Sequence, residues 1–210
     1  MNPNLLEYPE ANIIFSAEED YFNDFYKSHD ISTGGLNDLD YKDLYELCGR
    51  VNKYNSNIYQ PNIKIAEIGC YLGKTTIFLA YLFKEIKGEI YGIDWFKSSS
   101  SYSSIELKTM INNNIKIFGI TNIHIIEGES TEISKQFSDD YFDFIFIDAS
   151  HGYEDVKNDI NSWYPKTKNN GIISGHDFEN DGVVKAVIEK FGSSFKCTKH
   201  ERIWYHKKEE

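Results

Sequence analysis

The chain has 210 residues and a formal net charge of -11 at pH 7, and this length suits one α/β domain with a short appendage. The excess of acidic residues argues against a nucleic-acid partner, because phosphate binding requires a concentrated basic face. No apolar run approaches the roughly 20 residues that a membrane span requires, and a signal-peptide pattern is missing. We therefore expect a cytoplasmic protein without a membrane partner, whose three separated cysteines are reduced.

The first 60 residues differ from the rest of the chain and are rich in Tyr, Asp, Glu and Asn. Their leucine spacing predicts an amphipathic helix from about Asp38 to Tyr54 that packs on the following domain. A further helix or a lid is expected at residues 18–29. We predict a helical N-terminal extension over residues 1–60, with substrate or oligomer contacts, and a second domain over residues 61–210. The leucines assigned to the packed face are Leu36, Leu39, Leu44 and Leu47.

From residue 62 onward, apolar strands alternate with helical segments, which predicts a parallel sheet with crossover helices. The predicted class is α/β: a Rossmann-like, seven-stranded, mostly parallel sheet with helices on both faces and a C-terminal antiparallel hairpin. A turn is expected at Asn169-Asn170-Gly171. The predicted parallel strands are Lys64–Ile68, Glu89–Ile93, Ile123–Glu127, Phe142–Ile147 and Ile172–Gly175, and the hairpin strands are Phe195–His200 and Arg202–Lys207. The predicted helices are 74–84, one that ends at 118, a short one from 131, 155–163 and 182–191.

The segment from Glu67 to Thr76 reads Glu-Ile-Gly-Cys-Tyr-Leu-Gly-Lys-Thr-Thr and joins a buried strand to a helix, as nucleotide-binding turns do. A P-loop has four residues between its first glycine and Gly-Lys-Thr, whereas only three separate the two glycines here. A dinucleotide fingerprint requires glycine where this chain has Tyr71. The remaining pattern, Glu-x-Gly-x-x-x-Gly followed by Asp94 at the next strand end, resembles motif I of class I S-adenosylmethionine (SAM) methyltransferases.

This resemblance implies a set of SAM-binding residues. A carboxylate at the Asp94 position can accept hydrogen bonds from both ribose hydroxyls, although helix capping is an alternative role. Thr75 is placed to bond the SAM carboxylate from the helix start. Ser130 is placed at the adenine edge, and capping of the following helix is an equally good role for it. The full set is Glu67, Gly69, Tyr71, Gly73, Thr75, Asp94, Glu129 and Ser130.

A second group of polar residues follows the two later strands, at Asp148-Ala-Ser-His151 and at His176-Asp177. The carboxyl ends of neighbouring parallel strands meet at one edge of a sheet, where ligands bind. Asp148, Asp177 and His176 would supply two hard oxygen ligands and one imidazole, which suit Mg²⁺ or Mn²⁺. A bound cation can lower the pKa of a substrate hydroxyl, and His151 could then remove its proton.

These two elements resemble the metal-dependent sugar O-methyltransferases of macrolide antibiotic biosynthesis and their bacterial relatives. That family places a metal-binding Asp three residues before a His that acts as base, as Asp148 and His151 are placed here. It also has an acidic pair after the fifth strand, where this chain has His176-Asp177. The departure weakens the metal assignment at His176 and leaves Asp177 as the firmer ligand. Catechol O-methyltransferase resembles the arrangement more distantly.

The sequence thus predicts a SAM-dependent O-methyltransferase, assisted by a divalent cation, that methylates a hydroxyl of a sugar, nucleotide-sugar or glycan precursor. A homo-oligomer is also compatible with the sequence. Two alternatives stay open. One is a metal-dependent hydrolase or non-haem iron oxygenase that uses Asp148, His151, His176 and Asp177 as ligands. The other is a non-catalytic protein that binds SAM.

Overall fold

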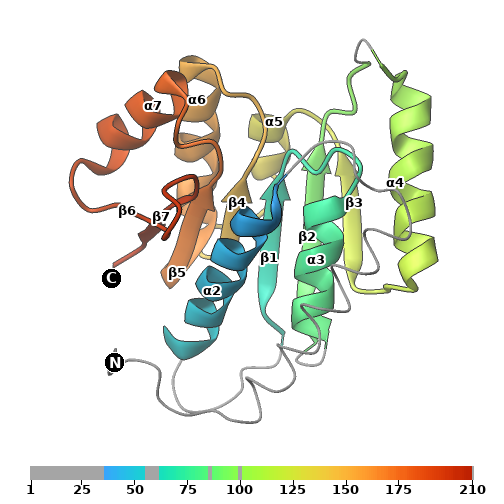
Figure 1. The fold of residues 1–210 in the computed structure, drawn as a ribbon, viewed down its shortest axis with the longest axis horizontal. Coiled ribbons are helices and arrows are strands. Elements are labelled where there is room, and N and C mark those ends of the chain that lie inside the picture. Colours follow the sequence, from blue (N-terminus) through green and yellow to red (C-terminus); the bar gives the residue numbers. More distant parts are fainter. Residues whose placement is uncertain (1–35, 55–61, 85–86, 99–100, 210) are drawn as a thin grey trace. The chain divides into compact units, whose positions relative to one another are not determined.

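One seven-stranded sheet organises the part of the chain that the structure describes, with strand order β3-β2-β1-β4-β5-β7-β6 (Figure 1). This computed structural model describes residues 36–54, 62–84, 87–98 and 101–209, which belong to one compact unit, Leu36–Glu210. The helix or lid expected at residues 18–29 lies outside the described residues. The strands are β1 (Lys64–Ile68), β2 (Glu89–Asp94), β3 (Ile123–Glu127), β4 (Phe142–Ile147), β5 (Thr167–Gly175), β6 (Lys196–Cys197) and β7 (Trp204–Lys207).

The first five strands run parallel, and β7 lies antiparallel to β5 and β6. The central strand β1 pairs with β2 on one side and with β4 on the other, so Ile68 is opposite both Ile93 and Ile147. On β5 the partner of Ile147 is Gly175. The carboxyl ends of β2, β1, β4 and β5 therefore lie next to one another along one edge. The predicted sheet class is confirmed.

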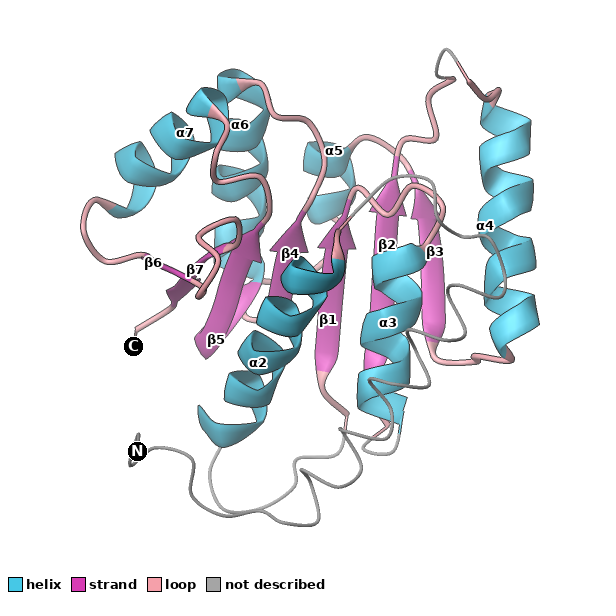
Figure 2. Ribbon diagram, viewed as in Figure 1, coloured by secondary structure: helices cyan, strands magenta, loops and turns pink. Residues whose placement is uncertain are grey.

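Helices cover both faces of the sheet (Figure 2). On one face lie α2 (Asp38–Tyr54) and α3 (Lys74–Phe83), which meet where the Tyr41 ring packs edge-on against Phe78. On the other face, α5 (Ser130–Ser134), α6 (Tyr153–Trp163) and α7 (Asp181–Phe191) share one core with the sheet. α4 (Ser104–Phe118) stands beside β3. Apolar residues of that shared core include Ile133, Val156, Ile160, Val187, Ile145 and Ile173.

The helix α2 begins at a reciprocal cap, in which Asn37 and Asp40 each accept a hydrogen bond from the other's backbone N–H. Leu44 and Leu47 are fully buried, as the leucine spacing predicted. The prediction was wrong for Leu39, whose side chain is 48% exposed, because it lies in the first turn on the solvent side. Every helix among the described residues is too short or too polar to span a bilayer.

Two other boundaries differ from prediction in the C-terminal third. The expected turn Asn169-Asn170-Gly171 lies inside β5, which starts at Thr167 and pairs irregularly with β4. Asn170 takes a positive φ of 65° and donates its N–H to the Lys208 carbonyl. A backbone that suits a turn is therefore held within a strand by pairing with the C-terminal segment. The hairpin strands are also shorter than predicted, because the chain turns around Glu201, where φ is 59°.

Candidate functional site

The predicted site residues gather at the carboxyl edge of the sheet, as the strand register requires. Gly69 follows the central strand β1, while Asp94 ends β2 on one side and Asp148 follows β4 on the other. Neighbouring strands are about 4.8 Å apart, so Asp94 and Asp148 belong to strands roughly 10 Å apart with Gly69 between them. Two polar groups are thus placed on opposite sides of one glycine turn, which we define as residues Gly69–Gly73.

Both glycines of this turn are required by packing. A side chain at Gly69, where φ is +91°, would overlap the Asp148 carbonyl oxygen and lie 2.7 Å from the Ala149 Cα. A side chain at Gly73, where φ is +81°, would lie 2.8 Å from the Ile111 Cγ1. The Gly69 N–H donates to the Ile93 carbonyl. The turn is therefore pressed directly against the strand end that carries Asp148.

Asp94 is held by backbone donors from two loops. Its Oδ2 accepts the Tyr71 N–H at 2.8 Å, and its Oδ1 accepts the Phe96 N–H at 2.6 Å. Both donors have positive φ values, 44° at Tyr71 and 47° at Phe96, which are strained for aromatic residues. Such strain is often found at functional sites. The Asp94 carboxylate is thus fixed beside the glycine turn before any ligand arrives.

Two further residues of the predicted SAM set lie under the turn. Glu67 is buried and accepts a hydrogen bond from the Thr76 hydroxyl. Burial, and then the charges of Asp148 and Asp94, raise the pKa of Glu67 well above its usual range, although the Thr76 hydrogen bond opposes the shift. The buried Thr75 Oγ1 lies 3.4 Å from the Tyr41 hydroxyl of α2. Within the described residues, no side chain caps the N-terminus of α3, which leaves a positive helix end beneath the turn.

At the end of β3 the structure separates the roles of Glu129 and Ser130. Glu129, not Ser130, caps α5, because its carboxylate accepts the Glu132 N–H at 3.1 Å. The Ser130 hydroxyl instead donates to Asp159 at 2.5 Å and accepts from the Trp163 indole at 2.8 Å. Burial raises the pKa of Asp159 to about 6, against the hydrogen bond from Ser130. The proposed capping role of Ser130 was wrong, and its adenine role stays a prediction.

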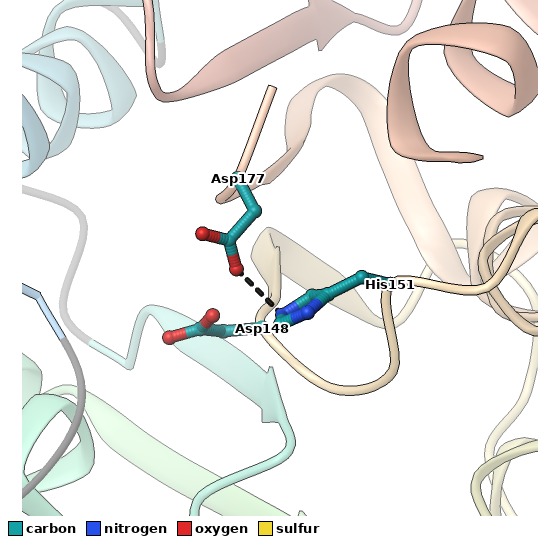
Figure 3. Close-up of side chains that lie close together, drawn as sticks. All are labelled: Asp148, His151 and Asp177. Atoms are coloured by element: carbon teal, nitrogen blue, oxygen red, sulfur yellow. Dashed lines mark ion pairs between the residues drawn. The ribbon is translucent and has the colours of Figure 1, made fainter. Parts of the chain in front are cut away.

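On the other side of the turn, Asp148, His151 and Asp177 form what we call the carboxylate–histidine group (Figure 3). One ligand atom from each residue lies within 4.8 Å of the other two. The Asp177 carboxylate is directed at the His151 ring, with Oδ2 2.7 Å from Nε2. Asp177 has a positive φ of 55°, which Asp tolerates better than most residues. Two hard oxygen ligands and one nitrogen could hold a divalent cation here.

His176 lies beside Asp148 and Asp177, as predicted, and its second ring nitrogen faces Asp40 of α2. Its ring is buried, with Nδ1 3.5 Å from Asp148 Oδ1 and 3.3 Å from Asp177 Oδ1, and Nε2 3.2 Å from Asp40 Oδ2. Burial alone would lower the pKa of His176, but the Asp148 and Asp177 carboxylates raise it to about 10. His176 therefore lies among three carboxylates, two of which belong to the group that could hold a metal, and its role as a metal ligand stays a prediction.

The composition of that group also bears on the alternative functions. A non-haem iron oxygenase typically uses two histidines and one carboxylate with open positions. The group defined here has one histidine and two carboxylates. It therefore suits Mg²⁺ or Mn²⁺ better than iron.

Sequence reasoning missed two residues on other elements that contact His176 or Asp177. Asp40 of α2 contacts His176, and Arg202, just before β7, has Nη2 3.7 Å from Asp177 Oδ1. The Asn37-x-x-Asp40 spacing signals a helix start, but it contains no information about the distant contact of Asp40. No sequence pattern points to Arg202.

The comparisons with known proteins agree with this arrangement. Residues 66–178, more than half of the chain, match the family described as a methyltransferase domain. This span begins in β1 and ends just after Asp177, so it contains the glycine turn, Asp94 and the carboxylate–histidine group. The chain belongs to this methyltransferase family and is a SAM-dependent methyltransferase. No curated protein matches its sequence.

Solved structures share the fold at low sequence identity. A candidate caffeoyl-CoA O-methyltransferase from Staphylococcus aureus is similar with a TM-score of 0.62 and 15% identity, over 94% of this chain and 99% of that one. An O-methyltransferase from Bacillus cereus in complex with SAH has a TM-score of 0.60 and 14% identity, over 98% and 94% of the two chains. CalS11, a TDP-rhamnose 3'-O-methyltransferase of calicheamicin biosynthesis, has a TM-score of 0.59 and 15% identity, over 97% and 96%. At these identities the likeness defines the fold alone.

Proposed function

We propose that this protein is a cytoplasmic O-methyltransferase that transfers the methyl group of SAM to a hydroxyl of a sugar, nucleotide-sugar or glycan precursor, with a divalent cation at Asp148 and Asp177. The observation that carries the proposal is the position of the carboxylate–histidine group, one strand from the glycine turn and in packing contact with Gly69. A methyl donor held at the turn would lie beside a centre that can activate a hydroxyl.

Methyl transfer to oxygen is an in-line displacement, so the enzyme must orient the hydroxyl and remove its proton. The hydroxyl oxygen forms a bond to the methyl carbon while the bond from that carbon to sulfur breaks, and the electron pair stays on sulfur. The hydroxyl proton passes to His151, whose Nε2 lies 2.7 Å from Asp177 Oδ2 and whose side chain is 53% exposed. A divalent cation at Asp148 and Asp177 would lower the pKa of the hydroxyl.

On the SAM side, different groups would bind different parts of the methyl donor. Asp94, fixed by two backbone N–H groups, would accept hydrogen bonds from the ribose hydroxyls. The N-terminus of α3 would face the SAM carboxylate, since helix N-termini favour negative charge. The neutral form of Glu67, favoured by its burial, avoids a third negative charge between Asp94 and Asp148.

The acceptor class is supported by resemblance and by the cation site. A cation that holds two neighbouring oxygens suits vicinal hydroxyls, which sugars supply. CalS11 shares the fold and methylates TDP-rhamnose, which makes TDP-sugars the first acceptors to test.

The test uses SAM with a labelled methyl group and a panel of TDP-sugars, with Mg²⁺ or Mn²⁺ and with EDTA. We expect label in a sugar ether with a cation present, and a loss of turnover of about 100-fold or more in EDTA. Turnover that survives EDTA and Asp148→Ala would contradict the cation part. SAH binding is measured first by calorimetry, because an absence of binding at millimolar ligand would contradict the proposal that SAM is the methyl donor.

A further inference from the structure

Four side chains beside the carboxylate–histidine group form a closed ring of alternating acidic and basic contacts, which we call the acid–base ring. Asp40 Oδ2 lies 3.2 Å from His176 Nε2, and His176 Nδ1 lies 3.3 Å from Asp177 Oδ1. The same Asp177 oxygen lies 3.7 Å from Arg202 Nη2, and Arg202 Nη1 donates to Asp40 Oδ2 at 2.8 Å. The ring joins α2, the end of β5 and the segment before β7.

Asp40 lies across the ring from Asp177, and its burial is unusual. Its side chain is 0% exposed, yet Asp40 Oδ1 and His176 Nε2 have no hydrogen-bond partner in the described part of the chain. A buried carboxylate that is only partly satisfied contributes little to stability and calls for another explanation.

The other buried acid of α2 provides a contrast. Asp43 accepts both the backbone N–H and the ring Nδ1 of His200, each at 2.9 Å. Asp43 therefore fastens α2 to the C-terminal hairpin with well-formed hydrogen bonds, and in the described part of the chain it makes no ion pair with the carboxylate–histidine group. Among the described residues, Asp40 contacts the start of its own helix, Arg202 and His176.

The Arg202 guanidinium lies near three carboxylates at different distances. Its guanidinium lies 2.8 Å from Asp40 and 2.7 Å from Glu179, but 3.7 Å from Asp177. A permanently charged guanidinium that paired closely with Asp177 would compete with a divalent cation for that carboxylate. Asp40 and Glu179 hold it at the longer distance. The His176 ring lies between Asp40 and Asp177 at similar distances, 3.2 Å on its Nε2 side and 3.3 Å on its Nδ1 side.

We propose that Asp40 is a positioning residue of the reaction centre, which holds Arg202 and His176 so that the carboxylates of Asp177 and Asp148 stay available to a divalent cation. The proposal rests on the proposed function, because it assumes that these carboxylates bind the cation. It also links the start of α2 to the reaction, although α2 lies outside the part of the chain that matches the methyltransferase family.

The test is a titration of the full-length protein with Mn²⁺, followed by electron paramagnetic resonance of the free ion. Asp40→Asn should weaken Mn²⁺ binding about tenfold, since the released guanidinium can pair with Asp177. The matched control Asp43→Asn removes a buried acid of the same helix and should change the affinity less than about twofold. SAH affinity, measured by calorimetry, should stay within about twofold of wild type in both variants. This measurement serves as the control that both variants are folded.

A second variant gives the opposite sign and so separates positioning from a loss of structure. Arg202→Gln removes the competing cation and should strengthen Mn²⁺ binding about threefold or more. If Asp40→Asn does not bind SAH, the Mn²⁺ affinity of Arg202→Gln alone tests the inference. Unchanged or weaker binding by Arg202→Gln, or wild-type affinity in a folded Asp40→Asn, overturns the inference. A wild-type protein that binds no Mn²⁺ overturns the cation part of the proposed function as well.

Discussion

The glycine turn and the carboxylate–histidine group lie at the ends of neighbouring strands, but they are held in place by different kinds of interaction. On the side of the turn, the Asp94 carboxylate accepts two backbone N–H groups, from Tyr71 and Phe96. On the other side, Asp177 is surrounded by other side chains: the rings of His151 and His176 and the guanidinium of Arg202. One region is organised by backbone and the other by ion pairs.

This difference has consequences for what each region can tolerate. Backbone donors keep their positions when a distant side chain changes, so the predicted SAM side should depend mainly on local conformation. Ion pairs between side chains respond to every nearby charge and to salt. The carboxylate–histidine group should therefore be more sensitive than the glycine turn to substitutions of nearby charged residues and to salt. The following predictions test this comparison, from the largest expected effect to the smallest.

Gly69→Ala should damage both regions, since Gly69 is the point at which they touch. The added Cβ would overlap the Asp148 carbonyl in a backbone conformation with φ of +91°, and we expect a loss of unfolding free energy of roughly 4 kcal/mol or more. Gly119→Ala is the matched control, because Gly119 also has a positive φ, of 64°, but open space around it. Its cost should be about 1 kcal/mol. Equal costs in urea unfolding would contradict the close approach at Gly69.

His151→Ala should damage only the acceptor region. Removal of a general base lowers the chemical rate by about 100-fold or more, while SAH affinity should stay unchanged because the Asp94 side is held independently. Single-turnover transfer from labelled SAM to a TDP-sugar substrate measures the rate, and calorimetry measures the affinity. A parallel loss of SAH binding would show that the two regions are not independent.

Asp94→Ala should damage only the donor region. We expect SAH binding to weaken about 30-fold, because the hydrogen bonds to the ribose and the anchor for Tyr71 and Phe96 are lost together. Glu127→Ala is the control, since Glu127 ends β3 directly opposite Asp94 and pairs with Lys108 at the surface. Its SAH affinity should match wild type. Calorimetry on both variants decides whether the carboxylate of Asp94 is specifically required.

Asp159→Asn should change neither region, and its effect on stability should be confined to high pH. The pKa of Asp159 is raised to about 6 by burial, so the folded protein favours its neutral form. The resulting stabilisation is present below the unfolded pKa of about 4 and is lost as pH rises through 6. At pH 8 the variant should be more stable than wild type by on the order of 3 kcal/mol or less, and near pH 4 the two should agree. Urea unfolding at both pH values measures the difference.

Much of the fold could be predicted, because strand periodicity is a local property. The bounds of β1, β3 and β4 agree with prediction to the residue. β5 was placed five residues short, since Asn-Asn-Gly favours a turn in isolation and pairing with the C-terminal segment outweighs that preference. Leu39 matched the spacing of a buried face, but its position in the first turn leaves it exposed.

The candidate site could also be predicted in part. The sequence by itself determined which polar residues stand at the strand ends, because a parallel sheet brings those ends to one edge. It also determined that the turn has the glycine spacing of a methyltransferase. Only the tertiary structure decided how these residues are charged and partnered. It placed Asp40 of α2 beside His176 and Arg202 beside Asp177, brought the rings of both His151 and His176 to the carboxylates, and showed that Ser130 donates to Asp159. Contacts between residues more than a hundred positions apart depend on packing of whole elements, and no local pattern encodes them.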